Sequence, residues 1–194
     1  MAGPSHKEQQ SEIGSRLIPL IIFLIVVVVF RGATQNGFVD WDDNAFVSNN
    51  LFIRSFSLEN IWEMFANFHT GNWHPITWLS HALDYKLFGL NPAGHHLTGI
   101  IFHGFNAVWI YFIFLRLGSM GEPRWQGGRA LHFGALFAAL LYACHPLRVE
   151  SVVWASERKD LLSAFFMFPA VLTYLSFIMA KDSRLRKRWR SCTI

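Results

Sequence analysis

Three acidic side chains lie close together at positions 40–43, where the chain reads Asp-Trp-Asp-Asp. The carboxylates of Asp42 and Asp43 are adjacent, and they repel each other unless a cation or a hydrogen-bond donor offsets the repulsion. Such a pair can bind a divalent cation, or one carboxylate can take the proton of a reacting hydroxyl group. The competing interpretation is a solvated turn at the start of a helix, which the residue types alone favour.

A second group of charged residues occupies positions 145–160, which begin with His145 and end with Asp160. Its acids and bases are interrupted by Val and Trp, and charges beside an apolar surface are costly unless they pair or bind a ligand. Arg158 and Lys159 are able to hold a phosphate group, Arg through two parallel hydrogen bonds and Lys as a point charge. The composition equally supports ordinary flanking charges whose side chains reach toward water.

The nine histidines show no zinc motif of two His four residues apart with a Glu between them. His96 and His103 are seven residues apart and share a helix face, so a metal or haem site is one hypothesis. A role in helix packing is the favoured interpretation for each of them.

The elements that must position these residues are apolar. Charged residues make up 15% of the chain, against about 25% in a typical soluble domain, which excludes an ordinary soluble domain and a disordered chain. A spanning helix needs about 20 mostly apolar residues. The sequence therefore predicts an all-α polytopic membrane protein with about four spans. These are expected at about 17–35, 97–115, 130–147 and 161–180.

The basic residues predict the orientation. Most of the 17 Lys and Arg residues lie in the N-terminus, in the loop after the second span and in the tail. By the positive-inside rule these parts face the cytoplasm. The high isoelectric point then reports topology, and a nucleic-acid partner is not expected. The expected parts are a cytoplasmic N-terminus at 1–16, a transmembrane domain at 17–180 with outer loops at 36–96 and 148–160, and a basic tail at 181–194.

Two helices are expected in the long outer loop. One runs over about 58–68 behind Ser57 as N-cap, and the other over about 75–88, with Pro75 in its first turn and Gly89 ending it. These helices either lie on the bilayer surface or form a small cap that packs on itself. The spacing of apolar residues does not distinguish between these two interpretations. The expected apolar faces are Ile61, Phe65 and Phe68 on the first helix, and Ile76, Leu79, Leu83 and Leu87 on the second.

Four segments together resemble a known family. They are FVDWDD at 38–43, NWHPITWLS at 72–80, FGLNPAGHH at 88–96 and HPLRVESVVWASERKD at 145–160. In order and content they are similar to the first part of the transmembrane and tetratricopeptide repeat proteins. That family resembles protein O-mannosyltransferases of the GT-C glycosyltransferase fold. The resemblance covers nearly all of residues 17–180.

The resemblance implies an enzyme that transfers a sugar such as mannose from a polyprenyl-phosphate carrier to a protein hydroxyl on the luminal or periplasmic side. It implies an integral protein of the endoplasmic reticulum or the bacterial inner membrane. Asp42 would be the base, and Asp43 would support it or bind a divalent cation, the one cofactor considered. Arg158 and Lys159, from their charge and position, are the candidates to neutralise the leaving phosphate. The supporting candidates are Glu150, Asp160, His145 and His74.

Two other functions are compatible with the sequence. A non-catalytic membrane scaffold would act through the Trp-rich outer loop, for example through Trp73 or Trp78. A His-ligated redox protein is a weaker hypothesis. Family members continue into further spans and 34-residue helical repeats, and no such repeat occurs in this sequence. The chain is therefore expected to be a fragment or a truncated product.

Overall fold

The computed structural model describes residues 6–68, 71–120 and 128–180. Within these ranges every regular element is a helix, and three helical segments are long and apolar enough to cross a membrane. The expected fold class, an all-α polytopic membrane protein, is confirmed. Arg124 and the tail at 181–194, which contribute to the predicted orientation, lie outside the described residues.

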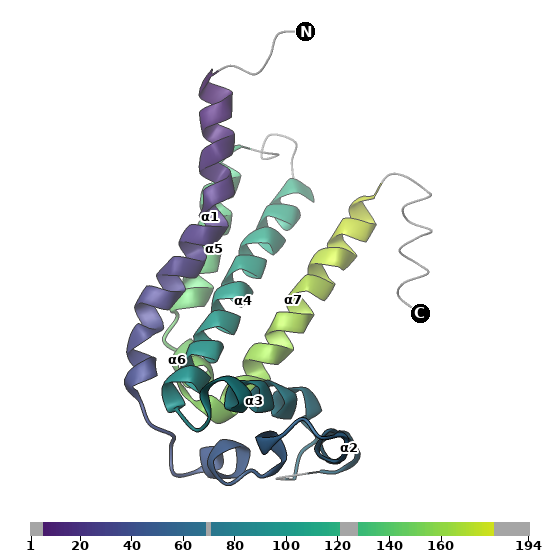
Figure 1. Cartoon of the computed structure of the whole chain (residues 1–194). Helices are drawn as coiled ribbons and strands as arrows, with labels where there is room; N and C mark the ends of the chain where they lie inside the picture. Colours follow the sequence, from purple (N-terminus) through teal and green to yellow (C-terminus); the bar gives the residue numbers. More distant parts are fainter. Residues whose placement is uncertain (1–5, 69–70, 121–127, 181–194) are drawn as a thin grey trace.

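The long helices stand side by side, with α4 between α1 and α7 and with α5 beside α1 (Figure 1). The candidate spans are Arg16–Gln35, Pro92–Met120 and Ala155–Met179. They contain most of α1 (His6–Phe30), all of α4 (Pro92–Met120) and all of α7 (Arg158–Met179). The expected span at 130–147 forms α5 (Arg129–Cys144), whose 16 residues rise only about 24 Å. A fourth crossing therefore stays a prediction.

Small residues let these helices pack closely. Ala107 of α4 is buried in one cluster with Ala135 and Ala139 of α5 and with Ile22 and Val26 of α1. Helices in lipid associate through such close contacts because the lipid offers them no hydrophobic driving force.

Polar residues of α4 also bond to the backbone of neighbouring helices. His103 Nε2 lies 2.9 Å from the carbonyl oxygen of Ala143, and Asn106 Nδ2 donates to the carbonyl oxygen of Leu161 at 2.9 Å. Both side chains thus face protein, as expected for polar groups within a span.

The long outer loop crosses one end of the helices. It contains α2 (Leu58–Ala66) and α3 (Pro75–Phe88), and α3 lies across the ends of α4 and α7 (Figure 1). Ser57 Oγ accepts a hydrogen bond from the backbone N–H of Asn60 at 3.1 Å, which is the expected N-cap. Gly89 ends α3 with a φ of 63°, a backbone conformation that glycine adopts without strain.

The apolar residues expected along one face of each helix are mostly not the buried ones. On α2 the buried residue is Met64, Phe65 is exposed, and Phe68 lies beyond the end of the helix. On α3 the side chains of Ile76, Leu83 and Leu87 are exposed. The buried face of α3 consists of Pro75, Thr77, Trp78, His81, Ala82 and Asp84. Burial of His81 and Asp84 has a specific cause, described below.

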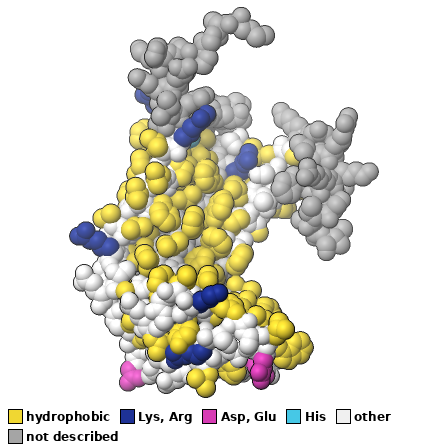
Figure 2. All heavy atoms as spheres, in the orientation of Figure 1, with side chains coloured by type: hydrophobic (Ala, Val, Ile, Leu, Met, Phe, Trp, Pro, Cys, Tyr) yellow, Lys and Arg dark blue, Asp and Glu magenta, His cyan; other side chains and the backbone are white. Residues whose placement is uncertain are grey.

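Hydrophobic side chains form a broad band over the long helices, and the charged side chains visible beside it lie toward its two ends (Figure 2). The acidic side chains visible on this face lie at the end that carries the outer loop. An apolar band of this kind suits the hydrocarbon region of a bilayer, which agrees with the fold class.

The remaining described elements are short. They are η1 (Arg31–Gln35), η2 (Asn44–Ser48), η3 (Phe52–Arg54), α6 (Arg148–Val153) and η5 (Ala155–Glu157). The last two lie between α5 and α7 and form the second outer loop, which packs against the first.

Candidate functional site

The two outer loops are joined through the carboxylate of Asp43. Its Oδ1 accepts a hydrogen bond from the backbone N–H of Ser156 at 2.9 Å, across 113 residues of sequence. Its Oδ2 accepts from the backbone N–H of Val39 at 2.8 Å. The side chain is fully buried. Two N–H donors therefore satisfy a charge that would otherwise be expensive to bury, and they fix the position of the first loop on the second.

Asp42 has a different environment. It is only half-buried, and it makes no hydrogen bond or ion pair with another described residue. Asp40, the other acid of the motif, is exposed and accepts a hydrogen bond from the side-chain amide of Asn44. The motif thus presents one engaged and buried carboxylate, Asp43, next to one accessible carboxylate, Asp42. Of these two adjacent carboxylates, Asp42 is the one whose oxygens accept no hydrogen bond from a described residue, and such a carboxylate is able to accept a proton.

Arg158 lies in the interior, at the first turn of α7. Its side chain is 1% exposed, and Nη1 lies 2.9 Å from Asp84 Oδ2. Nη1 also donates to Ser80 Oγ at 2.8 Å, and Nη2 donates to the carbonyl oxygen of His95 at 2.6 Å. The guanidinium therefore joins α3, α4 and α7. It was expected beside Lys159 on a phosphate, but its donors are directed to groups of the protein itself.

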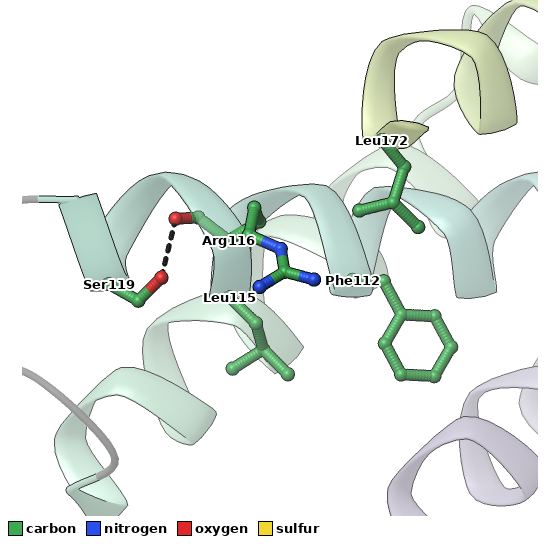
Figure 3. A pocket seen from close by; sticks show the side chains of 5 residues that line it. All are labelled: Phe112, Leu115, Arg116, Ser119 and Leu172. Atoms are coloured by element: carbon green, nitrogen blue, oxygen red, sulfur yellow. Dashed lines mark hydrogen bonds between the residues drawn. The ribbon is translucent and has the colours of Figure 1, made fainter. Parts of the chain in front are cut away.

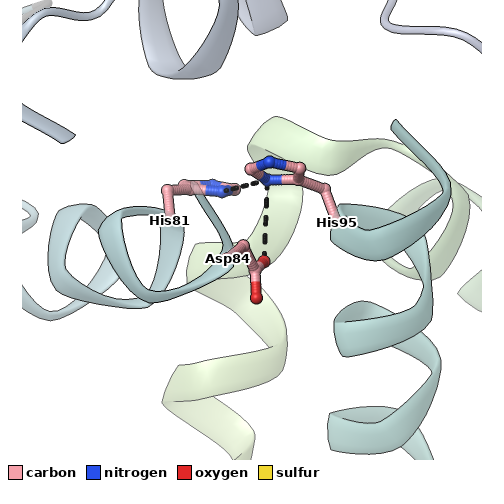
Figure 4. Close-up of side chains that lie close together, drawn as sticks. All are labelled: His81, Asp84 and His95. Atoms are coloured by element: carbon pink, nitrogen blue, oxygen red, sulfur yellow. Dashed lines mark hydrogen bonds and ion pairs between the residues drawn. The ribbon is translucent and has the colours of Figure 1, made fainter. Parts of the chain in front are cut away.

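His81, Asp84 and His95 form a compact cluster next to this ion pair (Figure 4). The Nδ1 atoms of His81 and His95 are 3.5 Å apart, and His95 Nδ1 lies 3.6 Å from Asp84 Oδ2. Thr98 Oγ1 donates to Asp84 Oδ1 at 2.7 Å. Burial, and then the positive charge of Arg158 and the neighbouring His95, lower the pKa of His81 well below its ordinary value of 6.5. His81 is therefore neutral at physiological pH.

The residue types of this cluster would suit a zinc ion, because one atom from each residue lies within 4.8 Å of the others. The charges argue against it. Arg158 already neutralises Asp84, so a divalent cation would add two unbalanced positive charges in a buried site beside a guanidinium. The cluster is better explained as the support of the Asp84–Arg158 pair. The cation considered for Asp42 and Asp43 would likewise compete with the two N–H donors of Asp43.

Lys159, next in sequence to Arg158, points to a cavity of about 290 Å³ between the beginnings of α3 and α7. Lys159 Nζ is 2.6 Å from Glu157 Oε1 and lies 5.7 Å from the ring centroid of Phe46. The polar side chains that line the cavity are Lys159, His74, Ser163 and Thr77, and its apolar or aromatic side chains are Phe65, Trp73, Pro75, Ile76, Leu162 and Phe166.

His74 is the N-cap residue of α3, so the positive end of this helix also faces the cavity. Burial lowers the pKa of His74 from 6.5, the charge of Lys159 lowers it further, and Glu157 partly opposes this effect. A cation, a helix N-terminus and an apolar wall meet here, which suits an amphipathic anion. The structure thus brings Lys159 and His74 together, although they are 85 positions apart in the sequence and belong to different outer loops.

The other predicted supporting residues lie outside this cavity. His145 is exposed, and its Nδ1 accepts a hydrogen bond from the backbone N–H of Leu147 at 3.2 Å. Glu150 is exposed on α6. Asp160 is exposed, and its Oδ2 accepts from Ser151 Oγ at 3.4 Å. The structure therefore separates the charged residues of the second loop rather than gathering them around one point.

Neither Asp84 nor Glu157 is among the site residues expected from the sequence. A signal for Asp84 was present, because Thr77, Ser80, His81 and Asp84 are polar residues spaced to lie on one side of the helix. Glu157 carried no such signal. Its pairing with Lys159 two residues away depends on the turn of η5, which the sequence does not specify.

Comparison with known proteins gives one consistent group of relatives. Protein O-mannosyl-transferase TMTC4 of Homo sapiens is 30% identical over 166 residues, which is 80% of this chain and 22% of the relative. Protein O-mannosyl-transferase Tmtc3 of Drosophila melanogaster is 25% identical over 207 residues, covering 96% of this chain and 22% of the relative. Tmtc1 of the same species is 26% identical over 185 residues, covering 92% and 19%.

No protein-family model matches the chain, and no solved structure matches it. The chain spans about a fifth of the length of the curated relatives that it matches. The family resemblance indicated by the four sequence segments is nevertheless confirmed, since these curated relatives are TMTC protein O-mannosyl-transferases related to this membrane chain over most of its own length.

Proposed function

We propose that this chain forms part of a membrane glycosyltransferase that moves mannose from a polyprenyl-phosphate carrier to a protein hydroxyl group. The names of the relatives support the mannosyl transfer and the protein acceptor. Because these relatives are animal proteins, we place the chain in the endoplasmic reticulum membrane rather than a bacterial one. The outer loops then face the lumen, as the positive-inside rule predicts.

The observation that carries this proposal is the hydrogen bond between Asp43 and the backbone of Ser156. It holds the acidic motif against the second outer loop and leaves the carboxylate of Asp42 accessible. In the proposed reaction Asp42 takes the proton of the acceptor hydroxyl as its oxygen attacks the anomeric carbon. The bond from that carbon to the carrier phosphate breaks, the phosphate leaves with its electron pair, and the configuration inverts. Asp43 acts as a positioning residue.

The cavity beside Lys159 is the proposed place of the carrier phosphate. Phe46, three residues after Asp43, lies under the ammonium group of Lys159, so the acidic motif and the cavity are adjacent. The apolar wall includes Phe166, whose side chain is exposed on a candidate span, and such a surface suits an isoprenoid chain. A fixed cation at a water-poor surface would stabilise the negative charge that develops on the leaving phosphate.

Arg158 has a supporting part in this proposal. It fixes the first turn of α7 through Asp84 and thereby holds Lys159, the next residue, at the cavity. Glu157 forms an ion pair with Lys159. When a phosphate binds, Lys159 would either leave this ion pair or contact Glu157 and the phosphate together. The cation that contacts the carrier phosphate is thus Lys159.

The test is Asp42→Asn in the natural protein that contains this chain, with Asp40→Asn as the matched control. Transfer of labelled mannose from dolichyl phosphate mannose to an acceptor protein is measured in microsomes. General base catalysis contributes about 10²–10⁴-fold, so Asp42→Asn is expected to lower the rate by at least about 100-fold while membrane insertion is kept. Asp40→Asn stays near the wild-type rate. Wild-type transfer by Asp42→Asn would rule out the assignment of the base.

A second candidate function, a non-catalytic scaffold, draws support from the exposed aromatic residues of the outer loop. The side chains of Trp41, Trp62 and Trp73 are exposed. Under this hypothesis both Asp variants keep full function, and Trp62→Ala releases a partner that co-purifies with the wild-type protein. The transferase proposal expects the reverse result with Asp42→Asn.

A further inference from the structure

A second cavity lies between α4 and α7, at the end of the helices away from the outer loops. It has a volume of about 260 Å³ and is lined by Phe112, Leu115, Arg116, Ser119 and Leu172 (Figure 3). The two helices are joined lower down, where Asn106 bonds to the backbone of Leu161, and they diverge from there toward the cavity (Figure 1). The cavity is thus a groove between two spans that opens at one membrane surface.

Arg116 is the charged residue of this groove. Figure 3 shows its guanidinium lying back along α4 toward Phe112, so that the charge is directed toward the apolar part of the helix. Among the described residues, no side chain forms an ion pair or a hydrogen bond with it. The hydroxyl of Ser119 donates to the carbonyl oxygen of Arg116 at 2.7 Å. A cation at an apolar boundary is costly unless an anion meets it.

The depth of Arg116 indicates which anion is available. It lies about one turn before the end of α4, which is where a span leaves the hydrocarbon and reaches the phosphate groups of the lipids. The walls beside it, Phe112 and Leu172, are apolar and suit an acyl chain. A lipid phosphate with its chains therefore matches both the charge and the apolar surface of the groove.

We propose that this groove binds an anionic phospholipid, with two N–H groups of Arg116 on its phosphate and an acyl chain against Phe112 and Leu172. The positive-inside rule predicts that this end faces the cytoplasm, where the leaflet carries anionic lipids. The bound lipid fills the space between the diverging spans and holds α4 and α7 at their separation. This proposal does not depend on the transferase function, because the groove lies at the opposite end from the outer loops.

The test counts the lipids that the protein retains after reconstitution in nanodiscs of phosphatidylcholine with a minor fraction of phosphatidylserine. The protein is released and its bound lipids are counted by native mass spectrometry. Wild type is expected to retain phosphatidylserine over phosphatidylcholine. Arg116→Gln is expected to lose about tenfold in this preference, which corresponds to one charge-assisted contact. Arg129→Gln, an exposed arginine at the start of α5 that does not line the groove, is the charge control.

A second pair of variants separates the groove from general surface charge. Leu172→Trp fills the groove and keeps Arg116, and it is expected to lose the retained lipid. Val171→Trp adds the same bulk at the neighbouring exposed position, which does not line the groove, and it is expected to behave as wild type. Circular dichroism on all four variants checks that the helices are kept.

Three results would overturn the proposal. The first is equal retention of the two lipids by wild type. The second is an equal loss in Arg116→Gln and Arg129→Gln, which would indicate surface electrostatics without a site. The third is displacement of the lipid by inorganic phosphate, which would indicate a simple anion site. Retention that survives inorganic phosphate and is lost in both Arg116→Gln and Leu172→Trp supports a lipid held by its phosphate and its chain together.

Discussion

Asp84 of α3 and Arg158 of α7 form an ion pair of 2.9 Å in which both side chains are almost completely buried. Thr98 and Ser80 complete the hydrogen bonds around the pair. The pair fastens a helix of the outer loop to two of the long helices. It also explains why α3 turns its polar side inward, since the burial of one charge requires the burial of its partner.

Removing one partner of this pair should destabilise the protein strongly. Asp84→Ala leaves the guanidinium of Arg158 buried without a counter-charge, and such changes cost about 3–5 kcal/mol. The free energy of unfolding is measured by denaturant titration in detergent micelles. The double variant Asp84→Leu with Arg158→Met replaces the pair by apolar groups and should be more stable than Asp84→Ala. Losses that simply add in the double variant would show that the two residues are not coupled.

The neutral His81 makes stability depend on pH. Burial lowers its folded-state pKa below the unfolded value of 6.5, so the unfolded chain binds more protons at acidic pH. The stabilisation is fully present above pH 6.5 and is lost as the pH falls from there toward the folded pKa, at about 1.4 kcal/mol per pH unit. Asp84, His95 and Arg158 face this ring from α3, α4 and α7.

Thermal unfolding between pH 7.5 and about pH 5 measures this dependence. His81→Gln should flatten the slope, and His145→Gln, which changes an exposed histidine, should leave it unchanged. Identical slopes in wild type and His81→Gln would show that another group is responsible.

Gly99 marks a close approach of α4 to the second outer loop. A Cβ atom at this position would lie 3.2 Å from the carbonyl oxygen of Val152. Gly99→Ala should therefore lower the free energy of unfolding by about 1–3 kcal/mol relative to Gly134→Ala, whose Cβ would meet no atom within 4 Å. Both changes gain the same helix propensity, so the difference isolates the contact. Equal free energies of unfolding for the two variants would mean that the backbone at Val152 moves away from the new methyl group without loss of stability.

Lys159 should matter for transfer more than for folding. Under the proposed function, Lys159→Gln lowers the rate constant of mannosyl transfer by about 100-fold, because a cation that meets the developing phosphate charge is lost. Lys86→Gln is the control. It removes a lysine of α3 whose ammonium group lies over the ring of Phe56, and it should keep the wild-type rate of mannosyl transfer. Measuring kcat and KM separately identifies the role, since an effect on KM alone would show that Lys159 only helps to bind the carrier.

The helices of the outer loop could be predicted from local signals, and their buried faces could not. Pro75 and Gly89 define the ends of α3, and Ser57 defines the start of α2, because capping depends on neighbours in sequence. The side of α3 that is buried depends on Arg158, which lies far away in the sequence. A pattern of apolar residues that would indicate the inward face in a soluble protein indicated the exposed face here.

The exposed apolar side of α3 favours one of the two interpretations left open by the sequence. Ile76, Leu83 and Leu87 are exposed, whereas a cap that packed on itself would bury them. An interfacial helix would place them against the apolar edge of the bilayer. We therefore expect α3 to lie at the membrane surface.

The candidate site shows the same limit. The sequence predicted both outer loops and the acidic motif, and the proposal for Asp42 and Lys159 follows from them. It did not predict that Asp43 bonds to Ser156 or that Arg158 points inward, because neighbouring residues on a helix start differ by about 100° in direction. Such differences are fixed only by contacts between distant segments.

The network around Arg158 also sets an order of events during synthesis. Ser80 and Arg158 are 78 residues apart, and His95 and Arg158 are 63 residues apart. The ribosome makes the polar side of α3 well before it makes the guanidinium that neutralises Asp84. Until the first turn of α7 has been made, the carboxylate of Asp84 on α3 lacks its counter-charge, Arg158. The charge of Asp84 is therefore neutralised only after the start of α7 has been made, so the buried contacts between α3 and α7 form late in synthesis.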